Sequence, residues 1–213
     1  MFAEISSNCV TIGDTKIPIL DDFSVLPKIK TKALMLVANT QKTAIRVAKI
    51  PHGKKLSQEA QWTLVEENFP IGEKMNENTH IFDGSIFKNE NGQSRFLIAA
   101  LPVIVSERIT EIGVALTGSI HRIARLDTIE HITFKKYCAE TNEPALVFLP
   151  QDYGIRILHI AENLPAGSFF ISNDPLYRED EFSRFYNSLD SPPEKFIFTE
   201  ENEEFSWLRL PMY

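Results

Sequence analysis

The fold class is indicated most clearly by one segment, Pro144-Ala-Leu-Val-Phe-Leu-Pro-Gln-Asp-Tyr-Gly-Ile-Arg-Ile-Leu-His-Ile160. Residues 145–149 form a continuous apolar run, the pattern of a strand that is buried on both faces. Residues 154–160 predict a second strand, and residues 150–153 between them predict a turn. We expect residues 168–172 to form the third strand of the same sheet.

The segment before this core predicts a hairpin and a helix. Two aliphatic runs, residues 33–38 and 44–50, are separated by Asn39-Thr-Gln-Lys-Thr43 and are typical of paired strands. Ser57 precedes an amphipathic stretch, residues 58–68, and can cap the helix that this stretch predicts. The prediction gives a helix of about three turns, which Pro70 ends.

Further elements complete a fold with helices packed on a mixed sheet. The patterns predict a hairpin at residues 80–87 and 95–101, a helix at 105–116 ending near Gly118, a strand at 121–127, a helix at 128–141, a helix at 179–189 and a strand at 195–199. The acidic run at 200–204 is expected to be a solvated connector. The fold class is therefore α/β (α+β). The chain shows no internal sequence repeat.

Composition restricts the function classes. The 213 residues are 43% hydrophobic, which allows a substantial core, and the formal net charge of −7 argues against a role in nucleic-acid binding. The N-terminus lacks a secretory signal, and apolar runs such as residues 96–105 are shorter than the roughly 20 residues that span a bilayer. We therefore expect a cytoplasmic protein without direct membrane insertion. The only cysteines, Cys9 and Cys138, predict neither a disulfide nor a thiolate zinc site.

No complete catalytic motif is present. Nucleophile-elbow, phosphate-loop and dinucleotide motifs are missing, and the five histidines are scattered without metal-ligand spacing. Asp83, Asp127 and Asp152 each follow or interrupt a predicted strand, where a two-metal enzyme would hold carboxylates. Capping or turn formation is the alternative role for these residues, and we favour it. Cys138, on a predicted helix with apolar neighbours, is interpreted as a buried structural thiol.

One aromatic residue is a candidate for partner binding. Trp62 falls in the middle of the predicted helix, beside Glu66 and Glu67. It is either a core anchor or an exposed interface residue, and the sequence leaves both open.

The order of motifs from residue 33 to about residue 172 resembles the actin-like platform proteins of bacterial type IV pili and type II secretion, the PilM type and the cytoplasmic part of the GspL type. The resemblance rests on Lys49-Ile-Pro51, Glu59-Ala-Gln-Trp62, Phe82-Asp83, Phe96-Leu-Ile-Ala-Ala100, Ile123-Ala-Arg-Leu-Asp127 and Asp152-Tyr-Gly154. It implies an actin-like or ribonuclease-H-like lobe with an inserted smaller subdomain. Residues 1–213 would form one actin-like unit, and residues 44–118 or so would be the insertion.

The departures from this family concern nucleotide binding. Family members that bind ATP have an early Asp-x-Gly turn, whereas the N-terminal stretch offers only Gly13-Asp14 in the reverse order. Asp152 and Gly154 match the second phosphate turn of the family, which makes them the candidate cofactor-binding residues, but the small hydroxyl residues that usually follow are missing. The chain is also shorter than PilM-type proteins and is expected to stop before a full second lobe. We therefore expect a degenerate relative without a bound cofactor or metal.

The leading hypothesis is a non-catalytic scaffold of a type IV pilus or type II secretion-like machine. It would lie in the cytoplasm, held at the inner membrane through a partner, and bind a segment of an inner-membrane protein or of an assembly ATPase. Recognition would use a sheet edge or a groove beside the helix at residues 58–68. The alternative is a metal-dependent enzyme on a ribonuclease-H-like sheet that uses Asp83, Asp127 and Asp152. A third reading is an ordinary α/β domain whose fold does not reveal its role.

Overall fold

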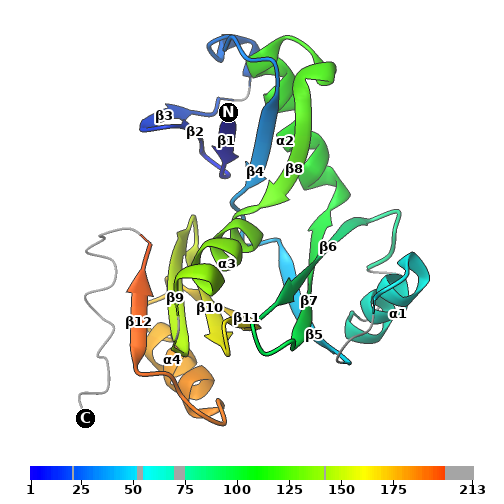
Figure 1. Ribbon diagram of the computed structural model, residues 1–213. Coiled ribbons are helices and arrows are strands. Elements are labelled where there is room, and N and C mark those ends of the chain that lie inside the picture. Colours follow the sequence, from blue (N-terminus) through cyan, green and yellow to red (C-terminus); the bar gives the residue numbers. More distant parts are fainter. Residues whose placement is uncertain (21, 52–54, 70–74, 142, 200–213) are drawn as a thin grey trace.

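The computed structural model describes residues 1–20, 22–51, 55–69, 75–141 and 143–199 (Figure 1). The acidic run predicted to be a connector, residues 200–204, lies outside them. The described residues form a five-stranded, a four-stranded and a three-stranded sheet with helices packed on them, which confirms the predicted fold class. In the same part of the chain, no helix has the length and apolar character needed to cross a membrane.

The five-stranded sheet contains the N-terminus. Its strands are β1 (Phe2–Ile5), β2 (Cys9–Ile12), β3 (Thr15–Pro18), β4 (Leu34–Ala38) and β8 (Ile123–Thr128), in the order β3-β2-β1-β4-β8. The first three strands are antiparallel neighbours, whereas β4 lies parallel to β1 and β8 parallel to β4. Short 3-10 helices, η1 (Phe23–Val25) and η2 (Ile120–Arg122), precede β4 and β8.

Helix α2 (Val103–Thr117) packs on this sheet (Figure 1). Ile109, Ile112 and Leu116 recur every three or four residues, so they share one helix face and pack against Leu36 of β4. Gly118 ends the helix with a φ of 77°, a left-handed conformation that glycine adopts without steric cost, as the sequence predicted.

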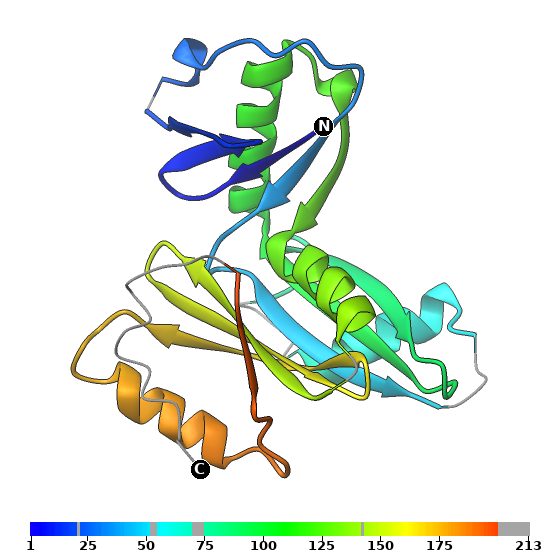
Figure 2. The same ribbon diagram turned by 60° about the vertical axis from the view of Figure 1, so that its left-hand side comes forward.

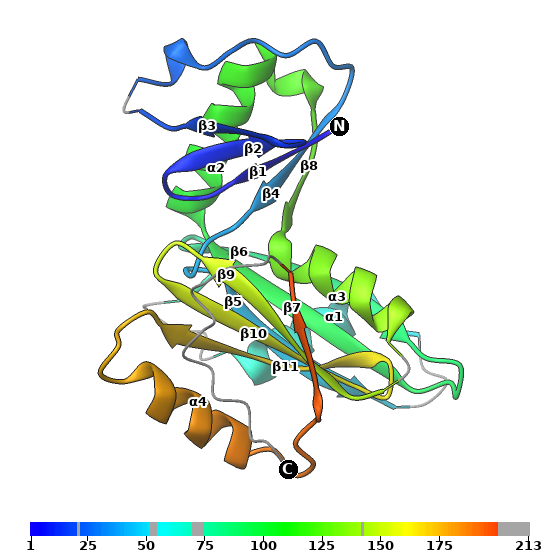
Figure 3. The ribbon, with the colours of Figure 1, turned by 90° about the vertical axis from the view of Figure 1, so that its left-hand side faces the viewer.

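The four-stranded sheet repeats this arrangement. Its strands are β9 (Ala145–Gln151), β10 (Gly154–Ala161), β11 (Leu164–Ser172) and β12 (Lys195–Phe198), in the order β11-β10-β9-β12. β9, β10 and β11 are antiparallel neighbours and β12 is parallel to β9, so the order and directions match those of β1 to β4. This sheet reproduces four of the five strands of the first, and whether the chain stops before a full second lobe stays a prediction. Figure 3 shows the two sheets one above the other.

Two helices cover the four-stranded sheet. Helix α4 (Arg178–Asn187) packs on one face through Phe182 and Tyr186. Helix α3 (Ile129–Glu140) joins β8 to β9 and packs on the other face, with Phe134 completely buried (Figure 2). Phe134 and Cys138 share a cluster with residues of both this sheet and the three-stranded sheet, so α3 binds the two sheets together.

The three-stranded sheet lies between β4 and α2 in the sequence. It consists of β5 (Ala44–Ile50), β6 (His80–Lys88) and β7 (Ser94–Pro102), in the order β5-β7-β6. The hairpin of β6 and β7 was predicted correctly. Helix α1 (Gln58–Asn68) packs on this sheet, and Ser57 caps it as predicted, because the Ser57 hydroxyl accepts a hydrogen bond from Ala60 N at 3.2 Å.

The predicted hairpin of residues 33–38 and 44–50 is wrong. β4 pairs with β1 and β8, whereas β5 pairs with β7 in a different sheet. Both segments are good strands, but β4 is buried between two parallel neighbours and has no free edge for β5. Residues 39–43 contain a turn, in which Thr43 N donates to Thr40 O at 3.2 Å, but the strands on either side of it belong to different sheets.

Candidate functional site

The turns that follow β1 and β9 meet between the two larger sheets (Figure 3). Ser7 N in the first turn donates a hydrogen bond of 2.7 Å to Asp152 Oδ2 in the second. A polar pocket of about 230 Å³ opens beside this contact. Its walls include Glu4, Asn39 and Gln151, and Asn39 Nδ2 donates to Glu4 Oε1 at 2.7 Å. The pocket therefore carries two carboxylates, those of Glu4 and Asp152, and one cation, Lys16, so its acidic groups outnumber its basic one.

Asp152 and Gly154, the candidate phosphate-turn residues, both have structural roles in this arrangement. The Asp152 carboxylate accepts a hydrogen bond from the backbone N–H of Ser7, a donor that could otherwise bind a phosphate. A Cβ at Gly154 would lie 2.1 Å from Ile171 O, so the pairing of β10 with β11 requires glycine here. Gly13-Asp14 lies in the turn between β2 and β3 and not in the first turn of the sheet. Nucleotide binding by Asp152 and Gly154 stays a prediction.

A buried ion pair lies next to these turns. Arg156 Nε is 3.4 Å from Glu130 Oε1, and Gln151 Nε2 donates to the same oxygen at 3.0 Å. Arg156 Nη2 also donates to the carbonyls of Gln41 and Thr43 at 3.2 and 2.9 Å. Burial raises the pKa of Glu130, which is fully buried, although Arg156 opposes this effect. The cluster connects α3, the four-stranded sheet and the chain segment between β4 and β5.

An apolar groove separates two strands that lie at sheet edges. β6 is the last strand of the three-stranded sheet, and β8 is the last strand of the five-stranded sheet. The groove between them, hereafter the β6–β8 groove, has a volume of about 420 Å³. Its apolar wall consists of Ile81, Phe82, Ala99, Leu101 and Leu126. Because each edge strand has a neighbour on one side only among the described strands, its other side presents unpaired backbone groups.

Arg125 crosses the groove. Its Nη2 atom is 3.0 Å from Asp127 Oδ2 on β8 and 3.8 Å from Asp83 Oδ2 on β6. Asp127 is buried, and its Oδ1 atom is 2.7 Å from His131 Nδ1 and accepts from Thr128 N at 2.9 Å. Burial raises the pKa of Asp127, but the bonds to His131 and Thr128 and the charge of Arg125 outweigh it and hold the pKa below its usual value.

These contacts correct the metal-enzyme hypothesis. Asp83 and Asp127 flank Arg125, whereas Asp152 binds Ser7 in a different pocket. The arginine between the two carboxylates offsets part of the negative charge that would attract a cation and occupies oxygens that would bind it. No group of three or more histidine, cysteine or acidic residues is arranged to hold a metal ion in the described ranges. Nor does Asp127 cap α3: the Thr128 hydroxyl does so, accepting from His131 N at 3.3 Å.

Trp62 lies on the outer surface of α1, with 38% of its area exposed. Its ring packs edge to face on Phe82, with ring centroids 5.8 Å apart. Side chains alternate along β6, so Phe82 and Trp62 lie on the face of the three-stranded sheet that α1 covers, opposite the face on which Ile81 lines the β6–β8 groove. Cys138 is buried, as expected of a structural thiol, and burial raises its pKa to about 12.

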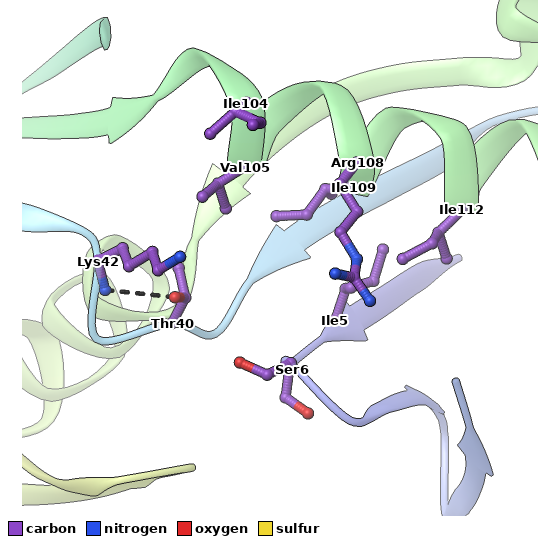
Figure 4. Close-up of a pocket in the computed structure, with 10 residues that line it drawn as sticks. Ile5, Ser6, Thr40, Lys42, Ile104, Val105, Arg108, Ile109 and Ile112 are labelled. Atoms are coloured by element: carbon purple, nitrogen blue, oxygen red, sulfur yellow. Dashed lines mark hydrogen bonds between the residues drawn. The ribbon is translucent and has the colours of Figure 1, made fainter. Parts of the chain in front are cut away.

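A second pocket, hereafter the Lys42–Arg108 pocket, lies between α2 and the ends of β1 and β4 (Figure 4). Its volume is about 210 Å³. Lys42 enters it from the segment after β4, and Arg108 descends from α2 toward Ser6 (Figure 4). Ile5 and Ile109 are among its apolar lining residues. Sequence analysis did not single out this pocket or the β6–β8 groove, because both are formed by segments far apart in the chain.

Comparisons with known proteins find similarity to solved structures. No protein-family model matches the chain, and no curated protein sequence matches it. A solved Bacteroides thetaiotaomicron protein with an actin-like ATPase fold and unknown function is 10% identical, with a TM-score of 0.50 over 96% of this chain and 93% of the other. A chain of the PilM-PilN type IV pilus biogenesis complex is 12% identical, with a TM-score of 0.53 over 88% of this chain and 65% of the other.

These similarities establish the fold. At such identities they concern the fold alone, and the present chain spans only 65% of the chain in the pilus complex. The chain has a PilM-like, actin-like fold, as the order of its motifs had indicated.

Proposed function

We propose that this protein is a non-catalytic scaffold of a type IV pilus or type II secretion-like assembly machine, and that it binds an extended segment of a partner protein in the β6–β8 groove. The observation that carries the proposal is an apolar groove of about 420 Å³ bounded by two edge strands. The similarity to a chain of the PilM-PilN complex supports a role in pilus assembly. The partner would be an inner-membrane component or an assembly ATPase, which would hold the protein at the cytoplasmic side of that membrane.

The groove suits an extended peptide for two physical reasons. A peptide in extended conformation can pair its backbone with the free side of β6 or β8, which provides main-chain hydrogen bonds. Its alternate side chains can then pack on Ile81, Leu101 and Leu126. Ile81 is 46% exposed, an unfavourable state for an aliphatic side chain that a partner would remove. We propose Trp62 as a partner-binding residue on a separate surface formed by α1, since 38% of its area is exposed.

The same proposal assigns a role to the segment inserted between β4 and α2. We propose that residues 1–213 form a single actin-like unit with an inserted subdomain at about residues 44–118. This subdomain contributes β6 and β7, which form one wall of the groove, while β8 of the five-stranded sheet forms the other. The insertion would therefore create the binding site.

The proposal also holds that no nucleotide is needed. Asp152 accepts the hydrogen bond of Ser7 N–H, and Glu4 adds a second carboxylate to the pocket between the sheets, against which Lys16 supplies a single positive charge. Calorimetric titration with ATP and magnesium should therefore give no binding heat. Binding that disappears in the Asp152→Asn variant would contradict this part of the proposal and indicate a nucleotide-gated assembly protein.

A pair of substitutions on β6 tests the groove. Ile81 and Ile86 are similarly exposed, at 46% and 41%, but only Ile81 lines the groove. A photo-reactive amino acid at position 81 should cross-link, in cells, to a component of a pilus or secretion machine, and one at position 86 should not. Ile81→Asp should abolish co-purification of that component, whereas Ile86→Asp should preserve it. Equal cross-linking from both positions, or capture of unrelated proteins only, would refute the proposal.

A further inference from the structure

The Lys42–Arg108 pocket brings two cationic side chains together without a carboxylate. Lys42 and Arg108 are both exposed, and neither has an acidic group within 4.0 Å in the part of the chain that the structure describes. The only described partner of the Arg108 guanidinium is the Phe23 ring, whose centroid is 5.8 Å away. In a chain with 29 acidic and 22 basic residues, most cations could find a counterion, so this convergence leaves positive charge available to a ligand.

Hydroxyl groups of Ser7 and Thr40 add neutral donors to the pocket. Ser6 also lines it, but its hydroxyl already donates to Cys9 O at 3.3 Å. The Thr40 oxygen already accepts from Lys42 N at 3.3 Å, so its hydroxyl hydrogen can be donated to a ligand (Figure 4). Ser7 N is not available, because it donates to Asp152.

The remaining wall is aliphatic. Ile5, Ile109 and Ile112 are buried at the base of the pocket, and Ile104, which is 74% exposed, lies at its edge. Apolar carbon placed on this wall would be removed from water at a gain of about 25 cal/mol per Å². A ligand that satisfies both walls must therefore be an anion at one end and a hydrocarbon at the other.

We propose that this pocket binds a small carboxylate with an aliphatic body. The guanidinium fork of Arg108 matches the two oxygens of a carboxylate, and Lys42 supplies a second charge. The volume of about 210 Å³ exceeds the roughly 150 Å³ of a cavity that accommodates benzene, which leaves space for a chain of about six carbons. Phosphate suits the pocket less well, because it would leave the aliphatic wall uncovered and cannot use Ser7 N.

Two sources can supply this chemistry, a free aliphatic acid or the C-terminal residue of a peptide. NMR saturation-transfer titrations of the full chain with hexanoate, with a short peptide ending in leucine and with its C-terminal amide distinguish them. We expect hexanoate or the free-acid peptide to bind, and the tighter of the two identifies the source. The amide should bind at least tenfold more weakly than the acid.

Substitutions in the pocket complete the test. Arg108→Gln and Lys42→Gln should each weaken binding of the preferred carboxylate at least tenfold, while Lys49→Gln, an exposed lysine on β5 outside the pocket, should not change it. Circular dichroism confirms that each variant is folded. Binding of inorganic phosphate alone, binding of neither carboxylate, or binding that both pocket variants retain would each overturn the proposal. The groove variants at position 81 test a separate surface, so the two proposals can fail independently.

Discussion

Asp152 Oδ2 accepts a hydrogen bond of 2.7 Å from Ser7 N, and this contact joins two turns that are 145 residues apart in the chain. Each turn follows the first strand of its sheet, because β9 has the same place in the four-stranded sheet as β1 has in the five-stranded one. A carboxylate of the protein thus lies where two equivalent turns approach each other. Asp152 therefore has a structural role that does not require a ligand.

Removal of this carboxylate should loosen the contact between the sheets. Asp152→Ala leaves Ser7 N without its acceptor, and since the site is solvent-accessible we expect a cost of about 1 kcal/mol, or a fall in melting temperature of about 2 to 4 °C. Amide exchange at Ser7 should also accelerate. Asp174→Ala is the matched control, because Asp174 accepts from Leu176 N within a single loop. Unchanged exchange at Ser7 in Asp152→Ala would show that the contact is not formed in solution.

The sequence predicted those features that depend on residues close together in the chain, and it failed for those that depend on distant residues. The Ser57 cap, the Gly118 helix end and the hairpin of β6 and β7 depend on neighbouring residues, and the structure has each of them. The pairing of β4 depends on β1 and β8, so the local pattern wrongly suggested β5 as its partner. The repeated strand order of the two sheets is a property of backbone pairing and leaves no repeat in the side chains.

The candidate site shows the same division. Asp152 and Gly154 were recognised as a turn, but the partner of Asp152 is Ser7, which no local motif indicates. Asp83 and Asp127 were singled out as candidate metal ligands. Both instead contact Arg125 of β8, whose side chain bridges β8 and β6. Which strands lie at a sheet edge, and therefore where a groove forms, is decided by the order of all strands together.

Removing one member of the buried Glu130–Arg156 pair should destabilise the protein more than replacing both members with apolar residues. Arg156→Met leaves the fully buried Glu130 without its counter-charge, and loss of one member of such a pair typically destabilises by about 3 to 5 kcal/mol. The double variant Glu130→Leu, Arg156→Met removes both charges and should recover much of this loss. Urea denaturation of the single and double variants measures the coupling. Additive effects would mean that the two side chains do not stabilise each other.

Asp127 should make stability depend on pH in the acid range. Its pKa is held below the usual value in the folded protein, so the unfolded chain binds a proton more readily. The stabilisation is therefore fully present above the unfolded pKa of about 3.9 and is lost as the pH falls through the lower folded pKa. Denaturation of the wild type and of Asp127→Asn at several pH values should show a difference in unfolding free energy that shrinks with acidification. A difference that stays constant would contradict the shift.

Substitution of Gly154 tests whether this glycine is needed for strand packing or for a phosphate-binding turn. A Cβ at this position would meet Ile171 O at 2.1 Å, and because a backbone oxygen in a paired strand cannot move aside easily, Gly154→Ala should destabilise the protein by about 1 to 3 kcal/mol without any nucleotide. Gly167, in the same sheet, has no atom within 4 Å of such a Cβ, so Gly167→Ala should change stability by less than about 1 kcal/mol. Thermal unfolding of both variants makes the comparison. Equal stability of the two would remove the packing explanation and return Gly154 to the role of a ligand-binding turn.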